Sequence, residues 1–222
     1  MDERYIRSLG ALTAGELALL RSKKLLIAGC GGLGGYLAEY LLRLGVGALV
    51  VADPEYFDRT NFNRQLLCTE DTLGCGKAEA AAKRAARVAP DCRFSGQVCR
   101  LNEATLPEYL PGCDAALDAL DSVSDRRMLK AACDRAGVPY IFGAVGGWVA
   151  QAALSLPGDS FLDNLYPEDF TPEETGILSF TPALGAALQA SLCVQYLCGR
   201  SPEPGRLYSF DLSEMVLHSL RL

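Results

Sequence analysis

Histidine is nearly absent from this chain, and paired-cysteine motifs are missing. The 222 residues contain one histidine, His218, and nine cysteines with no Cys-x-x-Cys among them. Zinc sites of the finger type need closely spaced Cys and His ligands, so we expect no zinc. The odd number of cysteines and their apolar surroundings also disfavour a disulfide framework and favour cysteine as a small core residue.

Long apolar segments and an excess of positive charge are missing too. No uninterrupted apolar run approaches the ~18 residues that a membrane-spanning helix needs. The N-terminus, MDERYIRSLG, is charged and lacks the apolar core of a signal peptide. With 21 basic and 27 acidic residues the net charge is −6, which disfavours non-specific binding to nucleic acid. We therefore expect a cytoplasmic protein that binds no membrane and, on balance, no nucleic acid.

Apolar stretches that end in Gly or Asp alternate with segments of helical period as far as Gly143. This alternation is typical of a parallel sheet with helices on both faces. The pattern predicts strands at 25–29, 48–52, 92–98, 115–118 and 139–142, and helices at 33–44, 75–88 and 123–136.

The pattern changes after Gly143. It predicts strands at 149–156, 206–211 and 215–220 and a buried helix at 183–198. Residues 158–175 carry six acidic and no basic side chains, which indicates a mobile surface loop. The expected fold class is α/β: a Rossmann-like, doubly wound, mostly parallel sheet with antiparallel C-terminal strands. We expect one domain over 1–222 with an N-terminal helical arm.

A glycine-rich turn joins the first predicted strand to the first predicted helix. It contains Gly29, Gly31, Gly32 and Gly34. Glycine allows the tight turn and the close approach of a phosphate, and the helix N-terminus attracts anions. Asp53 ends the next strand, where a carboxylate can accept hydrogen bonds from ribose hydroxyls. The turn indicates an adenine nucleotide and fits NAD, FAD, S-adenosylmethionine and ATP alike.

The segment after Asp53 favours ATP over NAD. Amide and guanidinium groups gather in one loop, at Asn61, Asn63, Arg64 and Gln65. Arginine grips phosphate in a bidentate fork, and amides can orient it. Lys77 begins the next helix, where a cation opposes the helix dipole, so its position suggests an anion nearby. The only histidine lies near the C-terminus, away from the expected nucleotide end of the sheet.

Two carboxylates follow the fourth predicted strand. Asp118 and Asp121 lie at its carboxyl end, where sheets of this kind form their ligand crevice. A carboxylate there can hold Mg²⁺ that bridges phosphates. Asp121 is also placed to cap the helix that starts at Val123, and both roles can hold together.

These motifs together resemble the MoeB/ThiF/HesA family, the bacterial relatives of ubiquitin-activating enzymes. The matching positions span the chain: Arg4-Tyr5-x-Arg7, the glycine turn at 29–34, Asp53, Asn61–Gln65, Gly76-Lys77, Asp118–Asp121 and Phe180–Leu184. The resemblance implies a ThiF/MoeB-type domain that uses ATP and Mg²⁺. Its reaction would adenylylate the C-terminal glycine of a ubiquitin-like sulfur-carrier protein ending in Gly-Gly, with release of pyrophosphate.

The resemblance also implies roles for single residues. The expected catalytic residues are Arg7, Arg64, Lys77 and Asp121, with Asp121 beside the metal. The expected nucleotide contacts are Gly29, Gly31, Gly32, Gly34, Asp53, Asn61, Asn63, Arg64, Gln65 and Lys77. Arg7 would reach the active site of a second subunit, so a homodimer is implied. The 158–175 segment matches the flexible crossover over the carrier's tail, and we expect it to become ordered when that tail binds.

The chain departs from the family pattern in two ways. It lacks the two Cys-x-x-Cys pairs that bind zinc in many members, and residues 143–192 contain no cysteine that could form a thioester with the carrier. Alternatives stay open: a related ATP-using enzyme acting on another carboxylate or on tRNA threonylcarbamoyladenosine, a non-catalytic nucleotide-binding protein and, more weakly, an NAD(P) oxidoreductase. The sequence does not distinguish molybdopterin, tungstopterin, thiamine and cysteine pathways, nor does it identify the sulfur donor.

Overall fold

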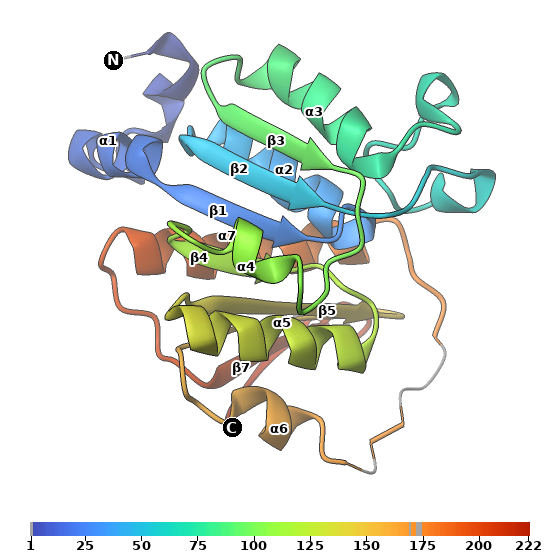
Figure 1. Ribbon diagram of the computed structural model, residues 1–222. Coiled ribbons are helices and arrows are strands. Elements are labelled where there is room, and N and C mark those ends of the chain that lie inside the picture. Colours follow the sequence, from blue (N-terminus) through green and yellow to red (C-terminus); the bar gives the residue numbers. More distant parts are fainter. Residues whose placement is uncertain (1, 169, 172–174) are drawn as a thin grey trace.

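The computed structural model describes residues 2–168, 170–171 and 175–222. Its strands form one sheet (Figure 1). Its order is β3-β2-β1-β4-β5-β6-β7-β8. The strands are β1 (Lys24–Ala28), β2 (Ala48–Ala52), β3 (Arg93–Gln97), β4 (Ala115–Asp118), β5 (Tyr140–Gly146), β6 (Val149–Ser155), β7 (Arg206–Asp211) and β8 (Val216–Arg221). The first five pair in parallel and the last three join antiparallel, which confirms the predicted fold class.

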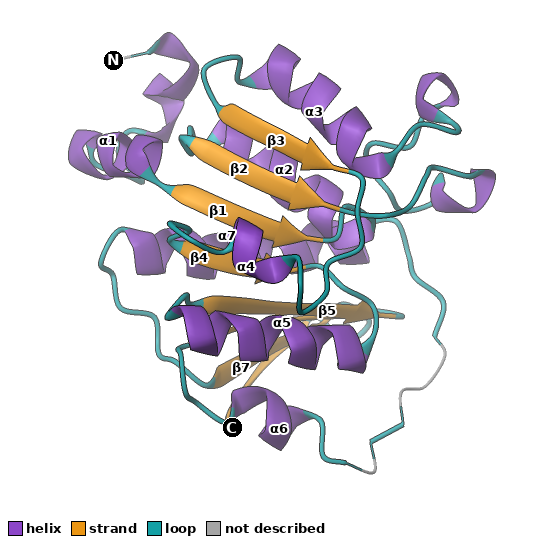
Figure 2. Cartoon of the chain, viewed as in Figure 1, coloured by secondary structure: helices purple, strands orange, loops and turns teal. Residues whose placement is uncertain are grey.

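Helices cover both faces of this sheet, each over its own apolar core (Figure 2). One core includes residues of α1 (Ala14–Ser22), α2 (Gly32–Arg43), α3 (Lys77–Val88) and α7 (Thr181–Leu197). The other includes residues of α4 (Leu106–Tyr109), α5 (Val123–Ala136) and α6 (Phe161–Leu165). None of the helices in the described ranges is long and apolar enough to cross a membrane. With both faces covered, ligands have access chiefly at the strand ends.

The N-terminal arm consists of a short 3₁₀ helix, η1 (Glu3–Ser8), followed by α1. The sequence carries a signature for the start of α1 in Thr13-x-x-Glu16. The Thr13 hydroxyl accepts from the Glu16 backbone N–H at 3.1 Å, and the Glu16 carboxylate accepts from the Thr13 N–H at 2.7 Å. This reciprocal cap satisfies backbone donors that a helix start otherwise leaves unpaired.

The prediction of a mobile loop over 158–175 is wrong for its first part. Helix α6 lies there, and its Phe161 and Leu162 are only 1% and 3% exposed. The Phe161 ring packs edge-on against Phe142 of β5, with 5.4 Å between ring centroids. The loop prediction followed the acidic residues of the segment and did not weigh these two apolar side chains. Their burial anchors the segment to the sheet. Residues 169 and 172–174 of the predicted loop lie outside the described residues.

Glu16 also gives the arm a dependence on pH. Arg200 Nε donates to Glu16 Oε1 at 2.8 Å, and this bond together with the Thr13 cap lowers the pKa of Glu16 from 4.5 to about 2. A carboxyl whose pKa is lowered by folding stabilises the protein above its unfolded pKa and loses that effect as the pH falls through the folded pKa. We expect Glu16→Gln to lower the thermal midpoint near neutral pH and to have a much smaller effect near pH 2.

Thermal unfolding followed at several pH values checks this. Glu103→Gln, at an exposed position after β3, is the matched control and should not change the pH profile. An equal loss of midpoint for Glu16→Gln at neutral and acidic pH would contradict the assignment.

Candidate active site

A cleft of about 870 Å³ opens at the carboxyl ends of the parallel strands. It lies where the strand order reverses between β1 and β4, the usual ligand position in doubly wound sheets. The predicted site residues on its wall are Gly29, Gly31, Gly32, Asp53, Asn61, Arg64, Gln65, Lys77 and Asp121. The fold thus brings together residues that are far apart in the sequence, while Gly34, Asn63 and Arg7 are not on the wall.

The glycine turn has two kinds of glycine. Gly29 has a φ of +96°, and a Cβ there would lie 2.5 Å from the Ala119 carbonyl oxygen. A Cβ on Gly34 would lie 2.0 Å from the Gly29 carbonyl oxygen, so Gly34 serves the packing of α2 on the turn. Gly31 is the N-cap of α2 and offers no side-chain cap, which leaves the first N–H groups of the helix available to an anion.

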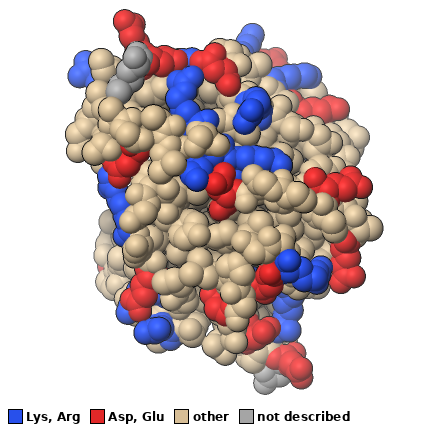
Figure 3. Space-filling model, turned by 60° about the vertical axis from the view of Figure 1, so that its left-hand side comes forward, with Lys and Arg blue, Asp and Glu red and all other residues tan. Residues whose placement is uncertain are grey.

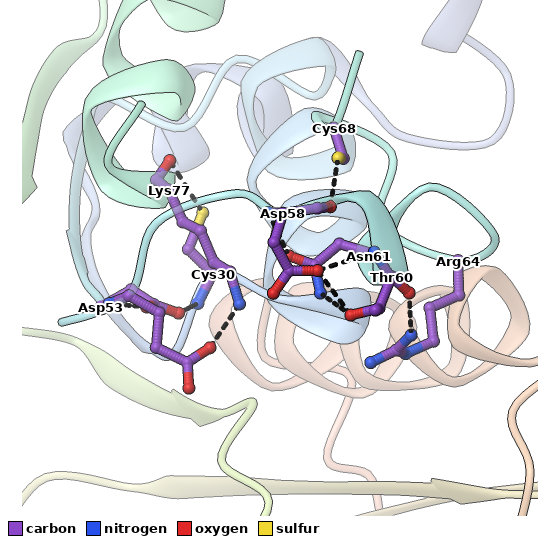
Figure 4. A network of polar contacts seen from close by, with 9 residues as sticks. Cys30, Asp53, Asp58, Thr60, Asn61, Arg64, Cys68 and Lys77 are labelled. Carbon is purple, nitrogen blue, oxygen red and sulfur yellow. Dashed lines mark hydrogen bonds and ion pairs between the residues drawn. The ribbon is translucent and has the colours of Figure 1, made fainter. Parts of the chain in front are cut away.

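Asp53 joins the glycine turn to the loop after β2. Its carboxylate accepts from the Cys30 N–H at 2.6 Å and from the Glu55 N–H at 2.8 Å (Figure 4). Burial raises the pKa of this carboxyl, and the two N–H donors and nearby Lys77 oppose that shift. The carboxylate therefore fixes two loops and still forms part of the cleft wall.

Lys77 is buried at the start of α3, with 3% of its surface exposed. Its ammonium forms an ion pair with the carboxylate of Glu55, which is itself largely exposed on the cleft wall. The position of Lys77 at a helix start suggested a nearby anion, and the Glu55 carboxylate of the protein is such an anion. The position of Lys77 alone therefore does not require a ligand. Sequence reasoning missed Glu55, although it lies only two residues beyond Asp53.

Arg64 extends from a loop that is held by a reciprocal cap. The Asp58 carboxylate accepts from the Thr60 N–H at 2.7 Å, and the Asn61 side-chain oxygen accepts from the Asp58 N–H at 3.1 Å. Arg64 Nη1 donates to the Thr60 carbonyl at 2.9 Å. In Figure 4, Asp58 and Asn61 lie between Arg64 and Lys77, so the two cations flank this loop.

The other two amides of the loop differ in position. Asn63 does not line the cleft, and its Nδ2 donates to the Ile177 carbonyl at 3.0 Å. Gln65 is 7% exposed on the wall beside Gly31, and its Oε1 has no hydrogen-bond partner among the described residues. A buried acceptor without a donor is unfavourable, so Gln65 is suited to accept from a ligand or a water molecule.

Asp118 is not available to a metal. It is fully buried, and its carboxylate accepts from Arg126 Nη1 at 2.7 Å, from the Leu120 N–H at 2.9 Å and from the Tyr140 hydroxyl. Arg126, which sequence reasoning did not single out, also donates to the Gly143 carbonyl at 2.6 Å and to the Leu120 carbonyl. Asp118 therefore holds the loop after β4 together rather than facing a ligand.

Asp121 extends into the cleft from that same loop. The alternative that it caps α5 is wrong, because the Ser122 hydroxyl accepts from the Asp125 N–H at 3.0 Å and fills that role. The described residues contain no group of three or more His, Cys, Asp or Glu side chains that could hold a metal. One carboxylate beside phosphates is nevertheless a binding mode that Mg²⁺ uses, and Asp121 fits it.

Arg7 lies away from the cleft of its own chain. It belongs to η1, whose Tyr5 packs against Gly45 near the edge where the strands begin. The cleft is at the other ends of the strands, and the arrowheads of β1 and β2 in Figure 1 point away from the N-terminus. Any role of Arg7 in this kind of site would therefore involve a second copy of the chain.

Comparison with known proteins places the chain among enzymes. It matches the ThiF family over residues 4–222. It is 30% identical over 208 residues to the SAMP-activating enzyme E1 of Haloferax volcanii, covering 90% of this chain and 77% of that one. It is 29% identical to two Escherichia coli proteins, the sulfur carrier protein ThiS adenylyltransferase (100% and 92% covered) and the molybdopterin-synthase adenylyltransferase (91% and 84% covered).

Solved structures show the same fold. E. coli MccB with ATP superposes with a TM-score of 0.83 at 23% identity over 100% of this chain, and this chain covers 72% of that MccB chain. E. coli tRNA N6-threonylcarbamoyladenosine dehydratase, TcdA, gives a TM-score of 0.76 at 23% identity, covering 89% of this chain and 95% of that one. This chain belongs to the ThiF family, and it is a nucleotidyltransferase.

Proposed function

We propose that this chain uses ATP to adenylylate the C-terminal glycine of a ubiquitin-like sulfur-carrier protein. The observation that carries the proposal is that one cleft wall combines the glycine turn with the cations of Arg64 and Lys77 and the carboxylate of Asp121. Relatives named as adenylyltransferases of sulfur carriers support the choice of acceptor. We also propose a single domain that acts in the cytoplasm as a homodimer, with Arg7 reaching the partner's cleft.

The reaction needs charge neutralisation more than proton transfer. An oxygen of the carrier's carboxylate attacks the α-phosphorus and forms a new P–O bond. The bond to the oxygen that bridges the α and β phosphates breaks, and pyrophosphate leaves with that electron pair. Arg64 and Lys77 offset the repulsion between the two anions, and the wall holds them in line. No general base is required, which agrees with a cleft wall that lacks histidine.

Other groups of the cleft wall also have a place in this scheme. The backbone N–H groups at Gly31 and Gly32 suit the phosphates, and Asp53 suits the ribose hydroxyls. Lys77 would exchange its Glu55 partner for phosphate oxygens. Asp121 would hold Mg²⁺, which when bound neutralises phosphate charge.

ATP–pyrophosphate exchange tests the proposal. We expect exchange to depend on a carrier with an intact Gly-Gly end and to disappear when the terminal glycine is removed. Exchange that depends on tRNA or on a small carboxylic acid would instead assign one of the related reactions. Acidic and basic side chains are interspersed on the face shown in Figure 3, which gives no support to tRNA. ATP binding without exchange with any acceptor would identify a non-catalytic nucleotide-binding protein.

A further inference from the structure

One amide side chain joins Arg64 to a segment more than a hundred residues away. Asn63 Oδ1 accepts from Arg64 Nη1 at 2.8 Å, while its Nδ2 donates to the Ile177 carbonyl at 3.0 Å. Ile177 belongs to the described segment 175–180, and both Thr175 and Ile177 are on the cleft wall. Asn63 itself is exposed and is not on that wall. It therefore connects two parts of the wall, Arg64 and Ile177, without lining the cleft itself.

The 175–180 segment is joined in turn to the turn between β5 and β6. The Gly147 N–H donates to the Gly176 carbonyl at 2.8 Å, and Gly147 and Ile177 form an isolated parallel bridge. Next to Gly147 is Trp148, whose ring packs 5.5 Å from that of Phe180 and is half exposed. Because Trp148 is the only tryptophan of the chain, its fluorescence reports on this segment.

The geometry makes these contacts dependent on one another. An amide group is planar, so a movement of Oδ1 with the Arg64 guanidinium also moves Nδ2 relative to Ile177. Hydrogen bonds weaken steeply when their distance or angle changes, so the segment favours the position that matches the guanidinium.

We propose that Asn63 is a positioning residue that couples phosphate binding at Arg64 to the position of the 175–180 segment. The proposal rests on the proposed function, because that function places the phosphates of ATP at Arg64. It goes further in giving Asn63 no contact with the nucleotide. Phosphate binding and the shape of the wall beside the acceptor are then set together.

Two substitutions separate the two bonds of Asn63. Asn63→Asp keeps an oxygen that can accept from Arg64 but removes the Nδ2 donor, and it places a carboxylate against the Ile177 carbonyl. Asn63→Ala removes both bonds. Asn164→Asp, at an exposed position of α6, is the matched control. Because Asn63 is exposed, we expect all three variants to fold, and thermal unfolding checks that.

The experiment titrates a non-hydrolysable ATP analogue and measures both its affinity by calorimetry and the emission of Trp148. We expect a saturable emission change in the wild type and in Asn164→Asp. Asn63→Asp should bind the analogue within about fivefold of the wild type, because its Arg64 contact survives, yet lose most of the emission change. Asn63→Ala should lose the emission change too. A purely structural role would lower the thermal midpoint without separating emission from affinity.

Full emission changes in both Asn63 variants, or analogue binding by the wild type without any change, would overturn the coupling. The outcomes also distinguish this proposal from the proposed function. An Asn63-dependent emission change without carrier-dependent exchange leaves the coupling standing and removes the function. Carrier-dependent exchange without an emission change supports the proposed function and overturns the coupling. A wild type that does not bind the analogue contradicts both proposals.

Discussion

Arg64→Ala is expected to lower carrier-dependent ATP–pyrophosphate exchange by about 100- to 1000-fold, the usual effect of removing one donor to developing charge. Arg64 lies on the cleft wall together with Lys77, and these are the cations proposed to contact the phosphates. Asp121→Ala should cause a loss of similar size, because it removes the carboxylate placed to hold Mg²⁺. Both losses should appear in the rate at saturating ATP and carrier.

Matched controls exist for both changes. Arg59 lies in the same loop as Arg64 but pairs with Glu70 at 3.6 Å and is not on the cleft wall. Asp163 is an exposed acid of α6. Arg59→Ala and Asp163→Ala should keep nearly full exchange. Thermal midpoints of the two site variants without nucleotide should stay close to the wild type. Retention of exchange by both Arg64→Ala and Asp121→Ala would show that the cleft is not where adenylylation occurs.

Arg126→Met is expected to lower the free energy of unfolding by about 3–5 kcal/mol, the usual effect of removing one partner of a buried ion pair. Arg126 is 6% exposed and Asp118 is fully buried, so the substitution leaves a carboxylate in the core without its cation. The carbonyls of Leu120 and Gly143 lose their donor as well. Denaturant unfolding monitored by circular dichroism measures the loss.

A second substitution identifies the cause. In Arg126→Met/Asp118→Asn the buried charge is gone, so we expect part of the lost stability to return. Arg135→Met, on the exposed surface of the same helix, should change stability by no more than about 0.5 kcal/mol. If Arg126→Met were no more harmful than Arg135→Met, the buried pair would have no structural role.

The alternation of strands and helices could be predicted because buried parallel strands read as continuous apolar runs, as at Leu25–Ala28. Helix α6 could not be predicted, because only two of its residues are buried and apolar and they lie within an acidic stretch. Asp118 and Asp121 look equivalent in the sequence. Only the packing of α5 shows that Arg126 neutralises the first and leaves the second in the cleft.

Contacts between distant segments account for the rest. Asn63 fits a phosphate-binding pattern, but its donor is directed at Ile177, a partner that no local spacing indicates. The ion pair between Lys77 and Glu55 likewise joins two segments whose contact no local spacing indicates. The predicted roles of the cleft residues in nucleotide binding stay predictions until the variants are measured.

The charged residues of the cleft wall are carried by loops and by the first turns of helices, above a sheet whose two apolar cores hold the fold together. Acceptor preference and folding can therefore change independently in evolution. Insertions after β5 or before α7 would alter what fits beside the nucleotide and leave the scaffold intact. In this way one fold could accept peptides, small proteins or modified bases as acceptors while its proposed triphosphate contacts stay the same.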